Sequence, residues 1–490
     1  MTHTDITTPR DTTAAEVDAI VRGAARAASA WKAAPLAHRA EALEAVADAL
    51  DAAADRLVPV AQRETHLAEA RLRGELRRTT FQLRLFADVV RDGSWLDVRI
   101  DHADPDWPMG APRPDLRRQL EPLGAVLVFA ASNFPFAFSV AGGDSASALA
   151  AGSAVVVKAH GAHPELSAAT TEVVAAALAE AGAPADLFQT VYGTEAGVRA
   201  LRADEIRAAA FTGSIAGGRA LFDIANAREV PIPFFGELGS VNPAFVTRSA
   251  ANRDVDGIVS GFVASVTGSA GQLCTKPGLL FVPEGSAVLD ALAAAGLPEG
   301  GPLLNEGIAA GFAASFDRVR GHGGVSALAE GSAGAGPAPA LLRTSIDAVL
   351  ADVHALTAEM FGPAALVVTY ADEAQLLEVA ARLEGQLTAT IVGNDDDEIA
   401  PALLAALADR AGRVLWNQWP TGVSVTHAQQ HGGPYPATTA SATTSVGTAA
   451  IERFARPVAY QNVPDALLPA TLQEANPLGI PRRVNGERPA

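Results

Sequence analysis

The sequence predicts an α/β protein made of a doubly wound parallel sheet followed by a second α/β unit. Short, continuous apolar runs alternate with helix-patterned segments between residues 124 and 214, and a similar alternation resumes after residue 242. The chain has 490 residues, of which 49% are hydrophobic and 19% are charged. This is a globular balance in a chain long enough for roughly two to four domains.

The first 121 residues divide into a helical part and an extended part. Residues 13–92 place apolar side chains at i, i+3, i+4 and i+7, which predicts amphipathic helices. Residues 95–121 form two extended segments on either side of a proline-rich stretch. We expect this second part to be a hairpin-like excursion from the main body.

Residues 122–238 carry the pattern of the doubly wound sheet. Continuous apolar runs predict buried parallel strands at 124–130, 153–159, 187–193 and 205–214. Helical segments separate these runs, and one of them has Pro164 in its first turn, where a missing N–H breaks no helical hydrogen bond.

The second half of the chain repeats the alternation less regularly. Strands are predicted at 242–247, 278–283, 364–371, 388–394 and 412–417. Helices are predicted between them at 254–274, 303–320, 373–385 and 400–412, and the first of these runs up to the cysteine.

Charge and cysteine content exclude several classes of function. The net charge of −18 is unfavourable for binding nucleic acid or an anionic membrane. The single cysteine cannot make an internal disulfide or a Cys-rich metal site. The start of the chain lacks the apolar core of a secretion signal, and no stretch reaches the ~20 uninterrupted apolar residues of a membrane helix. We expect a cytoplasmic protein without nucleic-acid or membrane partners.

The lone cysteine, Cys274, has two interpretations. Without context, a single cysteine in a large chain is more often a buried core residue than a nucleophile, by roughly two to one. Here it follows Gly271-Gln272 and precedes Lys276-Pro277, so the backbone turns sharply next to it. A neighbouring lysine would favour the thiolate, which is the reactive form.

Two polar residues at strand ends could support such a nucleophile. Glu237 would usually be a solvated carboxylate, but its apolar, glycine-flanked surroundings should raise its pKa toward that of a useful base. Asn133 could be a simple turn residue ahead of Pro135, or its amide could stabilise an oxyanion.

Three further sequence patterns give weaker evidence for a binding site. The spacing from Gly213 to Gly218 does not match the dinucleotide fingerprint. His160 and His163 form an H-x-x-H pattern without supporting carboxylates, so we expect no metal site there. Trp416 and Trp419 are most simply core residues or pocket walls.

Taken together and in order, the motifs resemble the aldehyde dehydrogenase superfamily over nearly the whole chain. The matching segments are Asn133-Phe134-Pro135, the strand-terminal Lys158, Phe211-Thr212-Gly213-Ser214, Glu237-Leu238-Gly239, Gly271-Gln272-Leu273-Cys274-Thr275 and Glu359-Met360-Phe361-Gly362-Pro363. The C-terminal run, from Trp416-Asn417 through His431-Gly432-Gly433-Pro434 to Arg456-Pro457-Val458, is similar to one subgroup. That subgroup contains 2,5-dioxopentanoate (α-ketoglutarate semialdehyde) dehydrogenases and NADP-dependent fatty aldehyde dehydrogenases.

The resemblance implies a specific domain organisation. Residues 1–94 and 122–238 would form a Rossmann-like cofactor domain, and residues 239–430 a catalytic domain. Residues 431–450 would return to the cofactor domain. Residues 95–121 and 451–490 would form an oligomerisation arm and C-terminal segment, because a two-stranded arm is unstable alone. We therefore expect a homodimer or a homotetramer.

The resemblance also implies chemical roles. Cys274 would attack the aldehyde, Asn133 would hold the oxyanion, and Glu237 would activate the water that hydrolyses the resulting thioester. Acyl-transferring relatives generally lack this glutamate, so coenzyme A is the less favoured acceptor. A non-catalytic homologue is disfavoured because these residues are all present.

The cofactor implied is NADP or NAD. The residues that match the family's cofactor site are Lys158, Phe211, Gly213, Ser214, Gly218, Glu359 and Phe361. Gly161 occupies the position where strongly NAD-preferring relatives carry a glutamate, which leaves room for a 2′-phosphate. Ile215 stands where NADP-preferring members often carry an arginine. We therefore expect both cofactors to work, with NADP slightly favoured.

The substrate is less closely defined. Phe134, Phe136, Trp416 and Trp419, together with Phe138, would suit an apolar chain. Dioxopentanoate enzymes usually carry an arginine at the position of Ala442. If that arginine recognises the substrate carboxylate, an uncharged aliphatic or aromatic aldehyde becomes the alternative to 2,5-dioxopentanoate.

Overall fold

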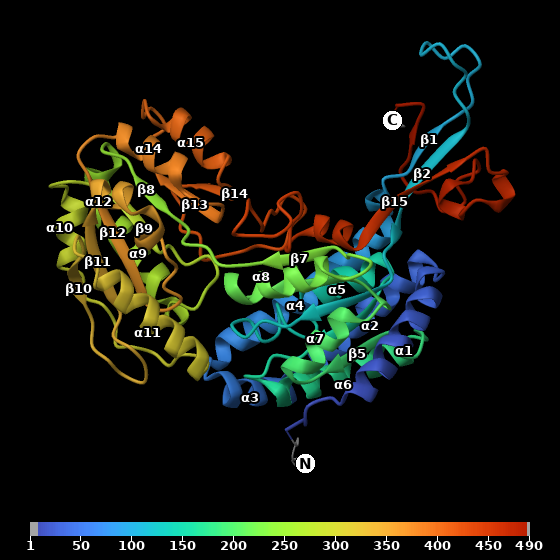
Figure 1. Ribbon diagram of the computed structural model, residues 1–490, viewed down its shortest axis with the longest axis horizontal. Helices are drawn as coiled ribbons and strands as arrows, with labels where there is room; N and C mark the ends of the chain where they lie inside the picture. Colours follow the sequence, from blue (N-terminus) through green and yellow to red (C-terminus); the bar gives the residue numbers. More distant parts are fainter. Residues whose placement is uncertain (1–7, 488–490) are drawn as a thin grey trace.

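The computed structural model describes residues 8–487 and arranges them around three sheets. Figure 1 shows one α/β unit on each side and a narrow arm that projects from the upper right. The predicted α/β class, with parallel sheets, is confirmed. Among the described residues, no helix is long and apolar enough to cross a membrane.

The N-terminal region is helical, as the apolar spacing predicts. Its four helices are α1 (Ala14–Lys32), α2 (Leu36–Ala52), α3 (Ala54–Thr65) and α4 (Glu69–Asp92). Thr13 and Glu16 form a reciprocal capping box that fixes the start of α1. α4 ends at Gly93, whose positive φ of 71° permits the left-handed turn that terminates the helix.

The first α/β unit contains a five-stranded, wholly parallel sheet in the order β5-β4-β3-β6-β7. The strands are β3 (Ala125–Phe129), β4 (Ala154–Lys158), β5 (Phe188–Val191), β6 (Ile206–Thr212) and β7 (Phe234–Glu237). The connecting helices are α5 (Gly143–Ala151), α6 (Pro164–Glu180), α7 (Thr194–Arg202) and α8 (Ile215–Asn226). β3 lies at the centre and is buried throughout, which explains its uninterrupted apolar sequence.

The second unit contains a seven-stranded sheet in the order β10-β11-β12-β9-β8-β13-β14. Its strands are β8 (Ala244–Val246), β9 (Leu279–Pro283), β10 (Ser326–Glu330), β11 (Ala340–Ser345), β12 (Ala364–Tyr370), β13 (Gln386–Val392) and β14 (Ala411–Trp416). Its helices are α9 (Val255–Thr267), α10 (Ala287–Ala293), α11 (Glu306–Arg320), α12 (Ile346–Ala351), α13 (Val353–Leu356), α14 (Ala374–Arg382) and α15 (Ala400–Ala408). β10 and β11 had no predicted counterpart; β10 is a partly exposed, antiparallel edge strand with a weak apolar signal.

One predicted boundary is wrong. The helix expected to run to Cys274 ends at Thr267, where the short 3-10 segment Gly268–Gly271 begins. Ser269 and Ala270 both have φ of 52°, and Gly271 has φ of 70°, so the chain cannot continue as an α-helix. A Cβ on Gly271 would lie 2.1 Å from the Gly362 carbonyl oxygen, so two loops meet closely at this point.

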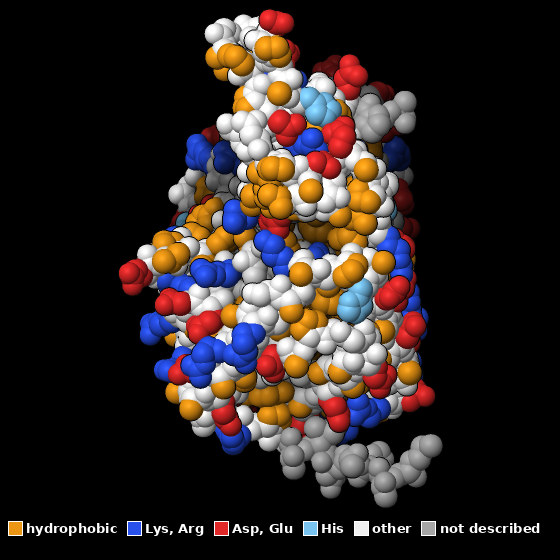
Figure 2. Space-filling model, turned by 90° about the vertical axis from the view of Figure 1, so that its right-hand side faces the viewer, with side chains coloured by type: hydrophobic (Ala, Val, Ile, Leu, Met, Phe, Trp, Pro, Cys, Tyr) orange, Lys and Arg blue, Asp and Glu red, His pale blue; other side chains and the backbone are white. Residues whose placement is uncertain are grey.

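The arm is a four-stranded sheet in the order β15-β2-β1-β16. It is built from β1 (Arg99–Asp101), β2 (Leu116–Pro122), β15 (Ala455–Gln461) and β16 (Arg483–Val484). The excursion predicted at 95–121 is therefore an antiparallel hairpin, joined by strands from the C-terminal segment. Hydrophobic side chains gather on the projecting arm at the top of Figure 2, and its hairpin exposes the large hydrophobic residues Trp107 and Met109.

Candidate active site

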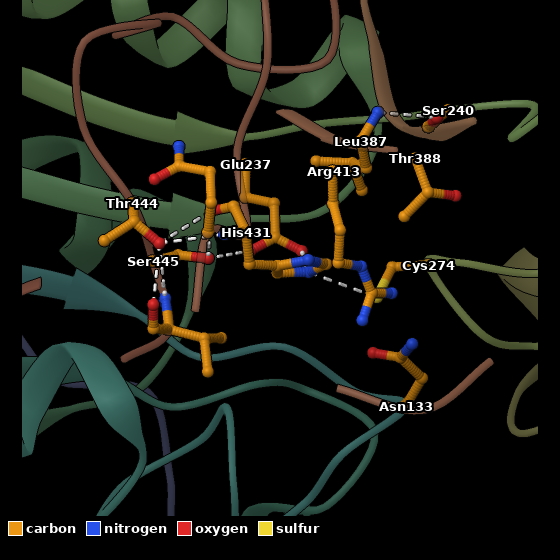
Figure 3. A network of polar contacts seen from close by, with 12 residues as sticks. Asn133, Glu237, Ser240, Cys274, Leu387, Thr388, Arg413, His431, Thr444 and Ser445 are labelled. Carbon is orange, nitrogen blue, oxygen red and sulfur yellow. Dashed lines mark hydrogen bonds and ion pairs between the residues drawn. The ribbon is translucent and has the colours of Figure 1, made fainter. Parts of the chain in front are cut away.

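The candidate site lies where β7 of the first unit meets the loop that carries Cys274 of the second unit. The segment after β14 runs back across the first unit and pairs with β7. Leu238 N–H donates to the Ala437 carbonyl, and Thr439 N–H donates to that of Gly236. This return segment carries His431 to the end of β7, and Figure 3 shows His431 between Glu237 and Cys274.

Three reactive side chains form a continuous polar network. His431 Nε2 lies 3.6 Å from Cys274 Sγ and 2.8 Å from Glu237 Oε1. His431 is fully buried, Glu237 is 3% exposed, and Cys274 is half-buried at the edge of the group. The arrangement can pass a proton between the thiol and the carboxylate.

Residues after His431 hold this network in position. Ser445 Oγ donates to Glu237 Oε2 at 2.5 Å, and Ser445 N–H donates to the His431 carbonyl at 2.8 Å. His431 N–H donates to Thr444 Oγ1 at 2.9 Å. Both the imidazole and the carboxylate are therefore oriented by neighbouring groups from one segment.

The electrostatics of Glu237 correct one expectation. Burial raises the pKa of its carboxyl group, as predicted, but the charge and hydrogen bond of His431, with the Ser445 hydrogen bond and the charge of Arg453, outweigh burial. The net pKa is lowered, so the expected rise is wrong. Glu237 is held as a carboxylate that can accept a proton.

The electrostatics of Cys274 correct a second expectation. Burial and the charges of Glu237 and Glu359 raise the pKa of the thiol well above its ordinary value. Lys276 does not favour the thiolate as predicted, because its Nζ points away and donates to the Met360 and Ala364 carbonyls, each at 2.6 Å. The resting cysteine is a neutral thiol, so its attack on an aldehyde requires a base.

Asn133 lies beside the cysteine loop, as predicted. Its side chain is 8% exposed, and its Nδ2 donates to the Gln272 carbonyl at 3.1 Å, leaving a second amide hydrogen for another acceptor. α4 fixes this loop: Arg71 donates to the Asn133 carbonyl at 2.6 Å, and Glu75 accepts the N–H groups of Phe136 and Ala137.

Glu237, Cys274 and His431 also form a set whose ligand atoms all lie within 4.8 Å of one another. A histidine that binds a metal almost always donates its other ring nitrogen to a partner. Within residues 8–487, His431 Nδ1 is buried and has no hydrogen-bond partner. This geometry favours proton transfer over metal binding.

The predicted cofactor residues of the first unit lie at the C-terminal ends of the five-stranded sheet. Lys158 ends β4 and Phe211 lies near the end of β6, and both pair in register with Phe129 of β3 between them. Gly213 and Ser214 are exposed at the start of α8, where Ser214 caps the helix by accepting the Gly217 N–H. Free N–H groups at such a helix start favour an anion.

Two glycines show how closely this region is packed. A Cβ on Gly218 would lie 2.1 Å from Leu238 Cδ2, so only glycine allows α8 to approach the residue next to Glu237. Gly161, in contrast, has nothing within 4 Å of its Cβ position, so the space there is open.

Glu359 and Phe361 lie in the loop before β12. Glu359 Oε2 is close to Gly239, where an added Cβ would lie 2.5 Å away. Burial raises the pKa of Glu359, with the Lys276 charge opposing this rise. The contact with Gly239 places the Glu359 side chain next to the strand end that carries Glu237. Phe361 is half-buried in the same loop.

The predicted substrate residues divide into two groups. Phe134 is half-buried and stacks edge-on with Phe138 at 5.4 Å, and the Phe138 ring lies 6.4 Å from that of His431. Trp419 packs against Phe262 of α9 at 5.4 Å. These aromatic residues lie in segments that border the network.

Two of the predicted substrate residues are placed elsewhere. Phe136 is 1% exposed and belongs to the hydrophobic core of the first unit, and its N–H donates to the buried Glu75. The Trp416 indole donates to Asp395 and packs on Gly393. Trp416 is three residues from Arg413, so the alternation of a strand puts it on the opposite face.

Sequence reasoning missed three residues near the thiol. His431 appeared in the C-terminal motif without an assigned role, because nothing in its local sequence links it to a glutamate 194 residues earlier. Arg78 of α4 and Arg413 of β14 both place positive charge near Cys274. Figure 3 shows Arg413 extending to the thiol from above.

Comparisons with known proteins agree with this geometry. Residues 1–454 match the model of the aldehyde dehydrogenase family. Alpha-ketoglutaric semialdehyde dehydrogenase 2 of Azospirillum brasilense is 46% identical over 484 residues, covering 96% of this chain and 92% of that protein. Alpha-ketoglutaric semialdehyde dehydrogenase of Acinetobacter baylyi is 43% identical over 434 residues, covering 86% and 82%.

Solved structures agree on the fold. Methylmalonate-semialdehyde dehydrogenase from Oceanimonas doudoroffii superposes with a TM-score of 0.77 at 19% identity, covering 92% of this chain and 91% of that chain. The bifunctional proline utilization A protein gives a TM-score of 0.78 at 24% identity, covering 93% of this chain and 45% of that one.

Proposed function

Because this chain belongs to the aldehyde dehydrogenase family and oxidises an aldehyde to an acid, we propose that its substrate is 2,5-dioxopentanoate and its product 2-oxoglutarate. The observation that carries the chemistry is the network of Cys274, His431 and Glu237. The substrate assignment is supported by two relatives, 46% and 43% identical, that are named for α-ketoglutaric semialdehyde.

In the proposed first step, Cys274 attacks the aldehyde carbon. His431 Nε2 first passes its proton to Glu237 Oε1, and the lone pair that this leaves on Nε2 then accepts the thiol proton, so that sulfur becomes nucleophilic as it attacks. The aldehyde oxygen takes up negative charge as the C–S bond forms. The free amide hydrogen of Asn133 and the Cys274 backbone N–H stabilise it.

We propose that the nicotinamide cofactor is held by Lys158, Glu359 and the start of α8 at Gly213 and Ser214. The exposed helix start, the strand-terminal lysine and the open space at Gly161 fit a dinucleotide. When bound, the nicotinamide supplies the hydride acceptor that converts the thiohemiacetal to a thioester.

The last step is hydrolysis. Glu237 returns its proton to solvent and then accepts one from a water molecule that attacks the thioester carbon. The C–S bond breaks, the acid leaves, and sulfur recovers a proton. The lowered pKa of Glu237 keeps the carboxylate ionised for this step at neutral pH.

We also propose that both cofactors are used, with NADP slightly favoured. The open space at Gly161 admits a 2′-phosphate, whereas Ile215 supplies no positive charge to attract one. Measurement of kcat/KM with each cofactor tests this, and a hundredfold preference for NAD would contradict it. Gly161→Glu should shift the preference toward NAD, because a carboxylate there repels a phosphate.

For assembly, we propose a homodimer or homotetramer joined through the arm and located in the cytoplasm. The arm exposes Trp107 and Met109, at 38% and 74%, and its outermost strand β15 pairs on only one side within the described chain. Light scattering at micromolar concentration measures the assembly, and a monomer would contradict the proposal.

The substrate proposal is tested with an aldehyde panel and both cofactors. We expect the highest kcat/KM for 2,5-dioxopentanoate, above succinate semialdehyde and neutral aliphatic or aromatic aldehydes. The alternative, a preference for uncharged aldehydes, rests on Ala442, which is exposed in the structure. A rate that rises with added coenzyme A would indicate acyl transfer instead of hydrolysis.

A further inference from the structure

Two half-buried arginines, Arg78 and Arg413, place positive charge near the reactive sulfur, and the mechanism above uses neither of them. Arg78 lies on the face of α4 that also carries Arg71 and Glu75, at spacings of three to seven residues. Arg71 and Glu75 are occupied by hydrogen bonds to the loop that carries Asn133. Within the described residues, Arg78 Nη1 and Nη2 make no such hydrogen bond.

The Arg78 guanidinium is buried with its donors unused. Within residues 8–487, Nη1 and Nη2 have no hydrogen-bond partner, which leaves four N–H groups unpaired. The guanidinium lies 5.2 Å over the Phe138 ring, and that ring lies 6.4 Å from the His431 ring. A buried, charged group with unpaired donors is costly unless something else binds there.

Arg413 approaches the sulfur from β14. Its Nη1 donates to the Gly422 carbonyl at 2.7 Å and its Nη2 to the Pro420 carbonyl at 2.8 Å. These bonds fix the side chain but use only two of its five N–H groups, and its Nε is buried without a partner in the described chain. Within that part of the chain, neither Arg78 nor Arg413 forms an ion pair with a carboxylate.

We propose that Arg78 and Arg413 are specificity-determining residues that bind the carboxylate of an oxo-acid substrate whose aldehyde carbon lies at Cys274. This inference deepens the proposed function and rests on it for the identity of the substrate. In 2,5-dioxopentanoate, four bonds separate the aldehyde carbon from the carboxylate carbon. The aldehyde carbon and the carboxylate are thus close enough in the substrate for one site to bind both, and guanidinium pairs carboxylate in two-point geometry.

The arginine pair also explains how the site could recognise a carboxylate although position 442 is an alanine. Ala442 is exposed on the return segment, whereas Arg78 and Arg413 approach the thiol from α4 and β14. The positive charge that an oxo acid requires is therefore supplied from other elements.

The first test uses alkylation of the single cysteine and needs no turnover. Iodoacetate is an anion and iodoacetamide is its neutral analogue, and both react only through the thiolate. Their rate ratio therefore isolates recognition of the anion from any change in thiol pKa. We expect this ratio to be higher for the protein than for a free thiol and to fall about tenfold or more in Arg78→Met and Arg413→Met. Arg78→Lys and Arg413→Lys should keep part of it.

Arg228→Met is the matched control. This arginine donates to the Leu201, Ala203 and Ile206 carbonyls at the opposite end of β6. It should leave the ratio unchanged. A wild-type ratio equal to that of a free thiol, or equal ratios in wild type and both methionine variants, would overturn the inference, and the wild-type measurement remains decisive if a variant does not fold.

The second test separates the inference from the proposed function. In each methionine variant, kcat/KM for 2,5-dioxopentanoate should fall about tenfold to a hundredfold, and for pentanal less than threefold. Equal losses of kcat/KM for both aldehydes would show that the arginines stabilise the Cys274 thiolate and would overturn the inference. The wild-type protein could fail to oxidise 2,5-dioxopentanoate and still react preferentially with iodoacetate. The proposed substrate would then be wrong, and the inference of an anion-binding site would be retained.

Discussion

His431→Asn is the most direct test of the proposed proton path. The substitution removes the Nε2 atom that lies 3.6 Å from the sulfur and 2.8 Å from Glu237. Glu237 then keeps only the Ser445 hydrogen bond and loses the largest of the effects that lower its pKa. The thiol, whose pKa is raised by burial, loses the base within reach.

The expected loss follows from the role of a positioned base. General acid–base catalysis contributes about a hundredfold to ten-thousandfold, so kcat/KM should fall within this range. Cofactor binding should be unchanged, because His431 lies on the return segment and not at the start of α8. Stopped-flow measurement of the NAD(P)H burst at several pH values gives the rate of acylation directly.

The control is His427→Asn, an exposed histidine four residues earlier in the same segment. It should retain the wild-type burst. A burst in His431→Asn within threefold of wild type, with an unchanged pH profile, would refute the proton path. Recovery of the rate in His431→Asn at high pH would support it, because hydroxide can then remove the thiol proton.

Further predictions address the other parts of the site. Glu237→Gln should preserve the burst but slow steady-state turnover at least tenfold, and equal effects on both would assign the deacylation base elsewhere. Because folding lowers the pKa of Glu237, its ionised form stabilises the protein above the ordinary carboxyl pKa; this stability is lost as pH falls through the lower folded value, and thermal denaturation of Glu237→Gln should lack this acid-side loss. Gly271→Ala should reduce kcat/KM at least tenfold, because its Cβ would lie 2.1 Å from the Gly362 oxygen and displace the cysteine loop; wild-type activity would contradict this contact. Trp416→Phe should leave kcat/KM within twofold for every aldehyde in the panel, since its indole faces Asp395 instead of the thiol.

Much of the fold was predictable because buried parallel strands have a strong local signature. β3 is apolar throughout, and β4 and β12 begin with continuous apolar runs, so these strands stand out from the helices around them. β10 lacks this signature because it is an exposed edge strand. The end of α9 was missed because Ser269 and Ala270 adopt left-handed backbone conformations that nothing in their side chains requires.

The site was predictable only in part, for a different reason. Asn133, Glu237 and Cys274 occur in short motifs, whereas Arg78 is one arginine in a helix that contains several. The pKa of Glu237 was predicted in the wrong direction because its partners, His431 and Ser445, come from a segment about two hundred residues later. Local sequence shows which groups are buried but not which groups meet them.

The ribosome synthesises the return segment long after the residues that this segment contacts in the active site. β7 and its glutamate leave the ribosome 194 residues before His431. At about 5–20 residues per second, this is a delay of roughly 10–40 s. For the last 157 residues of that interval, the nascent chain carries its thiol but lacks the imidazole that would activate it. The unfinished enzyme therefore lacks the base for aldehyde oxidation until synthesis reaches His431, the first of its last sixty residues.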